Sequence, residues 1–268
     1  MTVRVAVFAS GQGSNFQVLV QYASGTGTQS AEPSARSASP EWEVVLLVTD
    51  RKEAYALERA RNLGVESVVV SPSTGPQDFG ARLLTVLDKA RVDMVLNAGY
   101  LRLVPPSVVE RYHGRMLNLH PALLPSFGGK GMYGRRVHEA VLDAGVRLSG
   151  VTVHFVNEEF DRGHILAQWP VPVIPGDTPE TLAARIHDVE HRLYPAAADH
   201  LAQAIMDGSE PSAIPGPSAR FDIAEHLLSP TGVRSVHRRG QSQPGFPLDC
   251  EPIHPREPEG PKDPESHS

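Results

Sequence analysis

An asparagine and a histidine two positions apart, Asn118 and His120, lie in the segment MLNLHPALLPSF of residues 116–127. Side chains at positions i and i+2 of an extended strand leave the same face, so the amide and the imidazole would lie side by side. An amide can stabilise a developing oxyanion, and an imidazole can transfer a proton. The pair therefore suits attack on a carbonyl carbon. The alternative is a strand end where Asn118 caps a turn and His120 packs.

A second group is Ser10-Gly-Gln-Gly-Ser-Asn15, which follows the first apolar run. Its glycines permit a tight turn, and free N–H groups at the start of a helix attract phosphate. Phe16 stands where a dinucleotide fingerprint needs a third glycine, and the lysine of a P-loop is absent. The motif favours a monophosphate on a small substrate. The alternative is a glycine-rich turn capped by Ser14 or Asn15.

Three further features have both a functional and a plain interpretation. The segment GGKGMYG of residues 128–134 is expected to be a flexible loop over the cleft, with phosphate binding by Lys130 as the alternative. Asp161 could orient His120 and raise the pKa of its imidazole, or only form an Asp-x-Gly turn. His154 either packs in a strand or supports the site from behind.

Other chemistries are disfavoured by what the sequence lacks. The spacings of His113, His120 and His138 match no metal-ligand pattern, and no H-E-x-x-H motif occurs, so we expect no metal. No G-x-S-x-G elbow of a serine hydrolase is present.

The elements that must position these residues alternate along the chain. Helices are expected at residues 14–23, 53–63, 78–90, 105–112 and 177–206, where Pro195 could interrupt the last one. Strands are expected at residues 3–9, 43–48, 65–70, 93–98, 116–120, 149–156 and 165–173, of which the last two read as an antiparallel pair. This order predicts an α/β fold: a doubly wound, mostly parallel sheet with helices on both faces and an antiparallel edge. The groups Gly11–Asn15, Tyr100–Val104 and His120 should then meet at the carboxyl edge of the sheet.

Composition limits the classes of protein. The chain has 268 residues, 40% of them hydrophobic, and a net charge of −6 without a strongly basic stretch, which argues against a nucleic-acid partner. Its single cysteine, Cys250, excludes an internal disulfide framework. No leader and no 18-residue apolar run is evident, so a soluble cytoplasmic protein without membrane attachment is expected.

Two segments are poor in apolar residues. Residues 24–40 read as a surface loop inserted in a catalytic domain that spans residues 1–208. The remaining residues, 209–268, form a proline-rich tail that we expect to be largely disordered, because it cannot bury enough apolar surface to offset its ordering entropy.

Taken together, the motifs resemble those of the phosphoribosylglycinamide formyltransferases, a folate-dependent family of purine synthesis with a Rossmann-like fold. The resemblance covers about residues 3–207 and depends on the order and spacing of five segments: residues 10–15, 97–102, 118–125, 150–156 with Asp161, and 190–195.

The resemblance implies transfer of the formyl group of 10-formyltetrahydrofolate to the amino group of glycinamide ribonucleotide, in a monomer or homodimer. It places Asn118, His120 and Asp161 on the family's catalytic trio, with Asp161 keeping the imidazole charged near neutral pH. The ribonucleotide would contact Gly13, Ser14, Asn15, His187 and Glu190. The folate would contact Leu101, Arg102, Leu103, Val104, Asn118, Asn157 and Asp161.

The chain departs from the family pattern in two places. An arginine that often touches the folate is missing around Pro76, where Arg82 is the nearest, and the loop at residues 128–136 is longer. Three other kinds of protein would share parts of this pattern. A methionyl-tRNA formyltransferase would need a tRNA-binding C-terminal domain, a formylfolate hydrolase would carry an N-terminal regulatory domain, and a non-catalytic folate- or nucleotide-binding module would need no trio.

Overall fold

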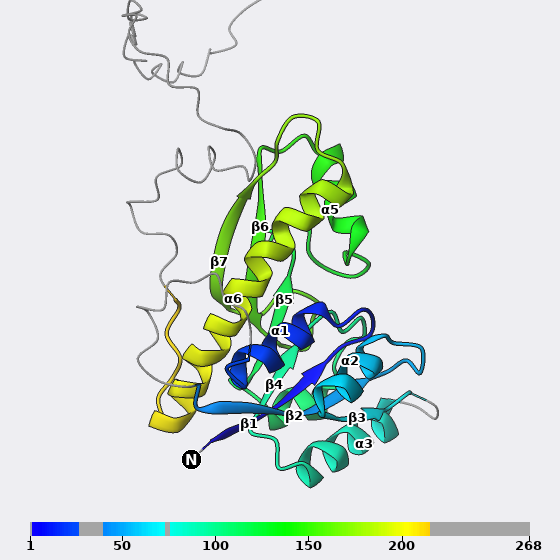
Figure 1. The fold of residues 1–268 in the computed structure, drawn as a ribbon, viewed down its shortest axis with the longest axis vertical. Coiled ribbons are helices and arrows are strands. Elements are labelled where there is room, and N and C mark those ends of the chain that lie inside the picture. The colour runs from blue at the N-terminus through cyan, green and yellow to red at the C-terminus, as the bar shows by residue number, and fades with distance from the viewer. Residues whose placement is uncertain (1, 27–39, 73–75, 215–268) are drawn as a thin grey trace, which may run out of the picture. The chain divides into compact units, whose positions relative to one another are not determined.

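A computed structural model describes residues 2–26, 40–72 and 76–214 (Figure 1). The expectations for most of the 24–40 loop and for nearly all of the tail therefore lie outside the described residues. The elements follow one another in the order β1 Val3–Phe8, α1 Ser14–Ala23, β2 Trp42–Thr49, α2 Ala56–Leu63, β3 Glu66–Val69, α3 Pro76–Lys89, β4 Met94–Asn97, α4 Pro106–Arg111, β5 Met116–His120, α5 Arg135–Asp143, β6 Leu148–Phe155, β7 Ile165–Pro172 and α6 Pro179–Asp207.

The strands form one sheet in the order β3-β2-β1-β4-β5-β6-β7. Strands β1 to β5 pair in parallel, whereas β6 pairs antiparallel with both β5 and β7. The chain order reverses between β1 and β4, and such a switch point opens a crevice beyond the carboxyl ends of the strands. The expected doubly wound sheet with an antiparallel edge is confirmed.

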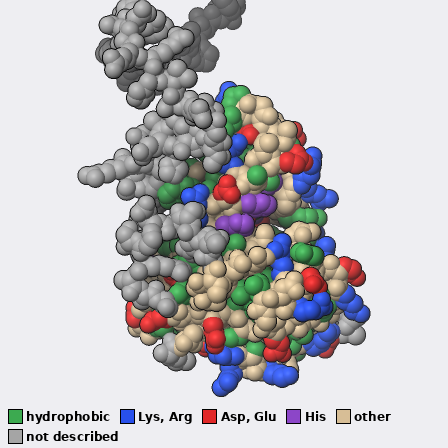
Figure 2. Space-filling view, in the orientation of Figure 1, with side chains coloured by type: hydrophobic (Ala, Val, Ile, Leu, Met, Phe, Trp, Pro, Cys, Tyr) green, Lys and Arg blue, Asp and Glu red, His purple; other side chains and the backbone are tan. Residues whose placement is uncertain are grey.

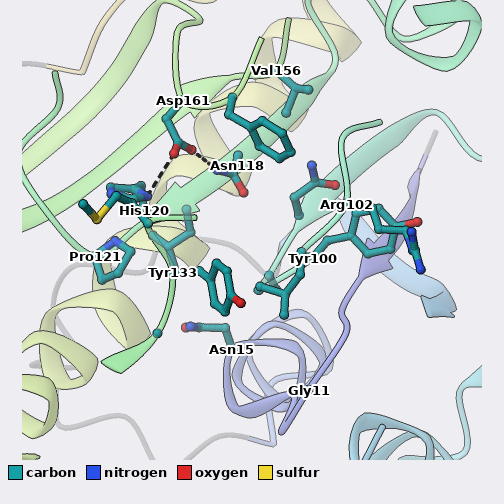
Figure 3. Close-up of a pocket in the computed structure, with 18 of the residues that line it drawn as sticks. Gly11, Asn15, Tyr100, Arg102, Asn118, His120, Pro121, Tyr133, Val156 and Asp161 are labelled. Atoms are coloured by element: carbon teal, nitrogen blue, oxygen red, sulfur yellow. Dashed lines mark hydrogen bonds and ion pairs between the residues drawn. The ribbon is translucent and has the colours of Figure 1, made fainter. Parts of the chain in front are cut away.

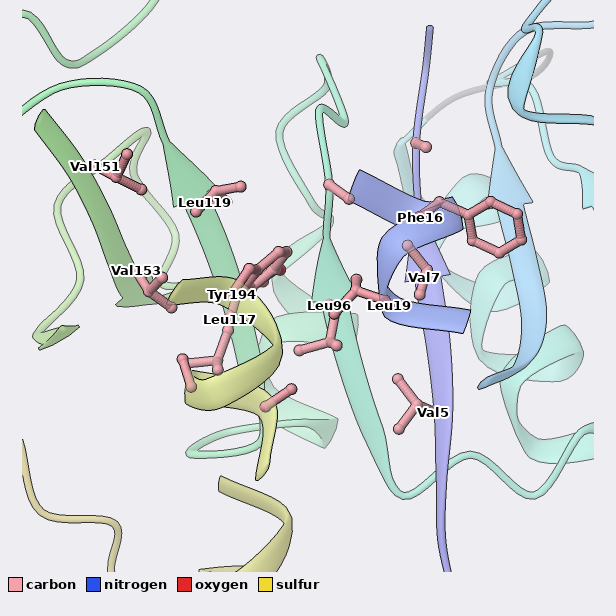
Figure 4. Close-up of a cluster of buried hydrophobic side chains, with 14 of the residues drawn as sticks. Val5, Val7, Phe16, Leu19, Leu96, Leu117, Leu119, Val151, Val153 and Tyr194 are labelled. Carbon is pink, nitrogen blue, oxygen red and sulfur yellow. The ribbon is translucent and has the colours of Figure 1, made fainter. Parts of the chain in front are cut away.

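The alternation of β1 shows why helices cover both faces of the sheet. Val5 and Val7 point into one apolar cluster with α1 and α6, which Figure 4 shows around Phe16 and Tyr194. Ala6 and Phe8 point the opposite way, into a second cluster with α3 and α4. A strand buried on both faces needs a continuous apolar run, and residues 5–8 of β1 provide it.

The helices differ from the expectations in two places. Residues 128–136 were expected to be a loop and no element was expected at residues 137–143, whereas helix α5 begins at Arg135. Helix α6 runs without a break from Pro179 to Asp207 although Pro195 lies inside it. The proline is buried in the packed side of the helix, so tertiary packing outweighs the hydrogen bond that its ring removes.

Helix α6 is fixed at its start and in its middle. Thr178 caps its first turn by a reciprocal pair of bonds with Thr181. Further along, the buried Tyr194 hydroxyl donates to the carbonyl of Asn97 at 2.8 Å and lies 3.3 Å from that of Leu117. The helix is thereby held over β4 and β5, the strands that lead to the site.

The chain after α6 turns back onto the sheet, where the backbone N–H of Ile214 donates to the carbonyl of Leu166 in β7. The domain boundary at residue 208 stays a prediction. None of the helices in the described ranges combines the length and the apolar character needed to cross a membrane.

Candidate active site

A cavity of about 610 Å³ opens at the carboxyl edge of the sheet, and Figure 3 shows side chains from several elements turned toward it. It is lined by the loops after β1, β4 and β5, by the β6–β7 connection and by α6. All the residues expected at the site from the sequence border this cavity: Gly13, Ser14, Asn15, Leu101, Arg102, Leu103, Val104, Asn118, His120, Asn157, Asp161, His187 and Glu190.

The turn after His120 is anchored by the two antiparallel strands. In β6, the hydroxyl of Thr152 donates to the carbonyl of Ala122 at 2.6 Å and accepts the N–H of Leu124. In β7, the amide of Gln168 donates to Thr152 and to the carbonyl of Leu124. These buried bonds fix the direction of the chain as it leaves β5, and with it the backbone that carries His120.

The carboxylate of Asp161 reaches both residues of the pair on β5 (Figure 3). Its Oδ2 atom lies 3.6 Å from His120 Nδ1, and its Oδ1 atom accepts from Asn118 Nδ2 at 3.3 Å. The N–H of Gly129 donates to Oδ2 at 2.8 Å. The other ring nitrogen of His120, Nε2, lies 2.8 Å from the carbonyl oxygen of Phe127. Segments 43 residues apart therefore meet around one point.

Two bends of unusual backbone geometry bring these groups together. Asp161 and Phe127 have φ angles of 56° and 57°, in the left-handed region that is unfavourable for residues with a Cβ atom. Near Asp161, a Cβ on Gly163 would lie 1.7 Å from the carbonyl oxygen of Phe155. Glycine is therefore required at position 163 for the chain to turn closely enough under Asp161.

His154 faces Asn118 across the β5–β6 ladder and supports it. Its Nδ1 atom lies 2.8 Å from the carbonyl of Phe155, which can only accept, so Nδ1 carries a proton. In the neutral ring Nε2 is then an acceptor, and it lies 3.0 Å from Asn118 Nδ2. The amide group of Asn118 is therefore oriented by two acceptors, His154 and Asp161.

Burial and charge act in opposite directions on the trio. Burial lowers the pKa of His120, and the Asp161 carboxylate and the Phe127 carbonyl only partly offset this effect. Burial alone would raise the pKa of Asp161, but the neighbouring rings of His154 and His120 and the N–H of Gly129 bring it below its ordinary value. Asp161 acts on His120 in the expected direction. The expectation of an imidazole that stays charged near neutral pH is wrong, because desolvation is the larger effect and lowers the pKa of His120.

The loop after β1 approaches α2 closely. Gly13 has a φ of 71° and precedes α1, and a Cβ atom at this position would lie 2.7 Å from the Cβ of Ala56. No side chain caps α1, and its first turn contains no acidic residue. The N-terminal N–H groups of the helix therefore remain available at the cavity, as anion binding requires.

Asn15 and Glu190 connect this loop to α6. Asn15 Nδ2 donates to Glu190 Oε2 at 2.9 Å, and His187 Nε2 lies 3.8 Å from the same oxygen. Glu190 is only 5% exposed, and burial raises the pKa of its carboxyl group above 4.5 even though Asn15 and His187 oppose this. The rings of His187 and His191 stack one turn apart, and Figure 2 shows histidines gathered on this face.

A buried carboxylate that the sequence reading missed, Asp50, positions the loop after β4. Its Oδ1 atom accepts from the Ser10 hydroxyl at 2.6 Å, and its Oδ2 atom accepts from Arg102 Nε at 2.7 Å. The Ser10 hydroxyl in turn accepts the N–H of Leu101 at 3.0 Å. Asp50 thus joins the loops after β1, β2 and β4. Its place directly after the second buried strand was the signal available in the sequence.

His138 on α5 is the second site residue that was missed. It borders the cavity and is 3% exposed, and burial with the nearby charges of His187 and His120 lowers its pKa to about 4. Its neighbours Val137 and Val141, four residues apart and both buried, were the helical signal. Arg82, the nearest arginine to the departure at Pro76, donates to the carbonyl of Ser71 and does not line the cavity.

An amide, an imidazole and a carboxylate beside an anion-binding helix start, all at the switch point of a doubly wound sheet, define a group-transfer site. Residues 3–198 match the family model of the formyl transferases, and the chain belongs to this family.

Within the family, the chain is similar to phosphoribosylglycinamide formyltransferases. It is 47% identical over 194 residues to the chloroplastic protein of Arabidopsis thaliana, covering 71% of this chain and 62% of that one. Against the protein of Bacillus subtilis it is 34% identical over 74% of this chain and 94% of the other. The solved structure of glycinamide ribonucleotide transformylase 1 from Geobacillus kaustophilus has a TM-score of 0.66 and 38% identity, over 75% of this chain and all of that one.

The chain thus spans about three fifths of the length of its plant relatives. Within the part of the chain that the structure describes, no group of three or more metal-binding side chains could hold an ion.

Proposed function

We propose that this protein transfers the formyl group of 10-formyltetrahydrofolate to the amino group of glycinamide ribonucleotide, a step of purine synthesis. The observation that carries the proposal is the convergence of Asn118, His120 and Asp161 in the cavity that the Gly13–Asn15 loop also borders. The similarity to phosphoribosylglycinamide formyltransferases over 94% of one relative and all of another supports it.

The two substrates would bind on different sides of the reacting centre. The phosphate would lie at the N–H groups of Gly13, Ser14 and Asn15, with the ribose and glycinamide near His187 and Glu190. The folate would lie along the loop Leu101–Val104 and near Asn157. In this loop the Arg102 guanidinium is engaged by Asp50, so the apolar side chains and backbone are what it presents to a folate ring.

The reaction would proceed by direct attack. The amine nitrogen forms a bond to the formyl carbon, and the carbonyl electron pair moves onto oxygen. The bond to the folate nitrogen then breaks, the carbonyl re-forms, and one proton passes from the attacking to the departing nitrogen. Holding two substrates in line supplies a large part of the rate of such a step.

His120 is suited to carry that proton. Its Nε2 faces a carbonyl and keeps its hydrogen, so Nδ1 is the basic atom of the neutral ring. With a lowered pKa, the ring is neutral when the amine attacks and can accept the proton. The resulting imidazolium is stabilised by Asp161 at 3.6 Å, balances the oxyanion and then protonates the folate nitrogen.

Asn118 would stabilise the oxyanion by changing one contact. Its amide hydrogens are directed to His154 at 3.0 Å and to Asp161 at 3.3 Å. The longer bond is the weaker one, so the hydrogen facing Asp161 is the one to turn toward the developing charge. His154 keeps the other hydrogen and holds the amide in this orientation.

The test is an absorbance assay of formylfolate consumption with and without glycinamide ribonucleotide. Consumption that requires the ribonucleotide and stops in His120→Ala, while the variant still binds the ribonucleotide, agrees with the proposal. Consumption that ignores the ribonucleotide would identify a formylfolate hydrolase, and ligand binding without turnover would identify a binding module.

Three expectations from the sequence remain predictions: the cytoplasmic location, the choice between monomer and homodimer, and the independence from nucleic acid.

A further inference from the structure

The cavity has few cationic side chains for two anionic substrates. Among the described residues that line it, the lysines and arginines are Arg102, Lys130 and Arg136. Arg102 is neutralised by the buried carboxylate of Asp50 at 2.7 Å. The described ion pairs of the protein include neither Lys130 nor Arg136, so these two keep their charge for a ligand.

Among the described residues, an aromatic ring and not an acidic side chain is the contact of the Arg136 guanidinium. Its guanidinium carbon lies 5.2 Å from the centre of the Tyr133 ring. Tyr133 itself turns into the cavity, as Figure 3 shows. A guanidinium that rests on an aromatic face keeps its N–H groups free at the edge, in the planar arrangement that binds phosphate well.

The start of α5 has a charge pattern that an anion would stabilise. Its first turn contains Arg135 and Arg136 and no acidic residue, although the helix dipole disfavours cations at this end. Arg135 is compensated by ion pairs with Glu139 and Glu180. Arg136 has no such compensation among the described residues.

The position of α5 indicates which of the two anionic substrates Arg136 would bind. The helix packs against α6. On α5, His138 is close enough to His187 of α6 for the charge of that ring to lower its pKa, and His187 lies beside Glu190. Glu190 in turn bonds Asn15 of the loop after β1. Arg136 therefore lies on the side of the cavity that α6 borders, where the ribonucleotide is proposed to bind.

We propose that Arg136, stacked on Tyr133, and Lys130 form the cationic half of the phosphate site, opposite the N–H groups of Gly13–Asn15. This inference rests on the proposed function, and it assigns to the segment 130–136 the recognition of a phosphomonoester. The backbone loop alone offers partial charges, whereas a dianion in a partly dry cavity is bound more strongly by full charges.

The experiment compares Arg136→Gln with Arg135→Gln. Both arginines are exposed in the same turn of α5, but only Arg136 lines the cavity. We expect Arg136→Gln to raise KM for the ribonucleotide about tenfold or more, and to change kcat and the KM of formylfolate by less than about threefold. Lys130→Gln and Tyr133→Ala should shift the same KM in the same direction, while Arg135→Gln should not.

Salt gives a second readout that a merely structural role would not produce. The dependence of kcat/KM for the ribonucleotide on ionic strength should be weaker in Arg136→Gln than in the wild type, because one charge of the site is gone. Equal effects of Arg135→Gln and Arg136→Gln would overturn the proposal. A shift confined to the KM of formylfolate would also overturn it, and would place the folate carboxylates there instead.

A binding measurement separates this proposal from the proposed function. Ribose 5-phosphate should bind the wild type at least about tenfold more tightly than Arg136→Gln in calorimetry, whether or not the protein turns over glycinamide ribonucleotide. If the wild type binds ribose 5-phosphate more tightly than Arg136→Gln but does not turn over glycinamide ribonucleotide, the proposed function is contradicted and the phosphate site is supported. If the wild type turns over glycinamide ribonucleotide but both proteins bind ribose 5-phosphate equally, only the phosphate site is contradicted.

Discussion

Asn15 and Glu190, 175 positions apart, are joined by a hydrogen bond of 2.9 Å between a side-chain amide and a buried carboxylate. The bond connects the first turn of α1 to the middle of α6 and closes one side of the cavity. The amide nitrogen is used by this contact, while the Oδ1 atom of Asn15 is buried without a hydrogen-bond partner in the described structure. That free acceptor is available to a donor group of the proposed ribonucleotide substrate.

The raised pKa of Glu190 predicts a particular dependence of stability on pH. Between 4.5 and the raised value, the folded protein binds more protons than the unfolded chain, so the free energy of unfolding falls as pH rises through this window. In Glu190→Gln the titrating carboxyl group is absent, so this fall in the free energy of unfolding does not occur. We therefore expect its free energy of unfolding, relative to the wild type, to increase with pH above 4.5.

Denaturant titrations at several pH values between 4 and 8 measure this difference. Glu158→Gln, at an exposed position, is the matched control and should show no such trend. A difference between Glu190→Gln and the wild type that stays constant with pH would contradict the prediction.

Asp161→Asn should lower the pKa of His120 further. The carboxylate is the largest of the effects that raise this pKa against burial, and an amide does not carry its charge. NMR titration of the His120 ring in both proteins measures the change. Turnover should fall by about 10²–10⁴, the usual contribution of a positioned acid–base group.

The control is Glu159→Gln, which changes an exposed residue that also lines the cavity. An unchanged or higher His120 pKa in Asp161→Asn would show that the carboxylate does not act on the ring.

Asp50→Asn should loosen the loop after β4. The asparagine keeps an acceptor for Ser10 but loses the charged bond to Arg102, at a cost of about 1–3 kcal/mol in the free energy of unfolding. Because this loop borders the cavity, KM for formylfolate should rise more than KM for the ribonucleotide. Arg51→Gln provides the comparison. Arg51 lies 3.9 Å from the same carboxylate with a half-exposed side chain, and the change should cost under about 1 kcal/mol. Equal losses of stability in the two variants would argue against a role of Asp50 in holding this loop.

Gly13→Ala should destabilise the protein by at least about 1 kcal/mol, the lower end of the cost of overfilling a packed space. The new Cβ would lie 2.7 Å from the Cβ of Ala56, at a backbone φ of 71° that disfavours it further. Gly11→Ala in the same loop meets no heavy atom within 4 Å and should change stability by under about 0.5 kcal/mol. Thermal and denaturant unfolding of the two variants measures this difference in stability. A Gly13→Ala protein as stable as Gly11→Ala would show that α2 can move aside.

The strands and most helices could be read from the sequence because each carries its own local pattern. Strand β5 and helix α1 have the expected bounds, and the other foreseen elements differ by a few residues at their ends. The convergence of the loops after β1, β4 and β5 followed from topology alone, since the carboxyl ends of parallel strands share one edge.

What could not be read depends on contacts between distant residues. The role of Asp50 is set by Ser10 and Arg102, which are 40 and 52 positions away. The protonation of His120 depends on how deeply the fold buries it, which no spacing reveals. Helix α5 was hidden because glycines precede it and because one residue of its buried face is a histidine, His138.

The β5–β6 register has a consequence for how this architecture can diversify. Asn118 stands opposite His154 because the ladder aligns them, whatever the length of the chain that connects the two strands. An insertion between residues 144 and 147, in the turn from α5 to β6, would therefore leave this alignment in place. A single added residue inside β6 would turn His154 to the opposite face and disable the centre. Natural variation in such proteins should accordingly accumulate in the turn from α5 to β6 and spare the ladder.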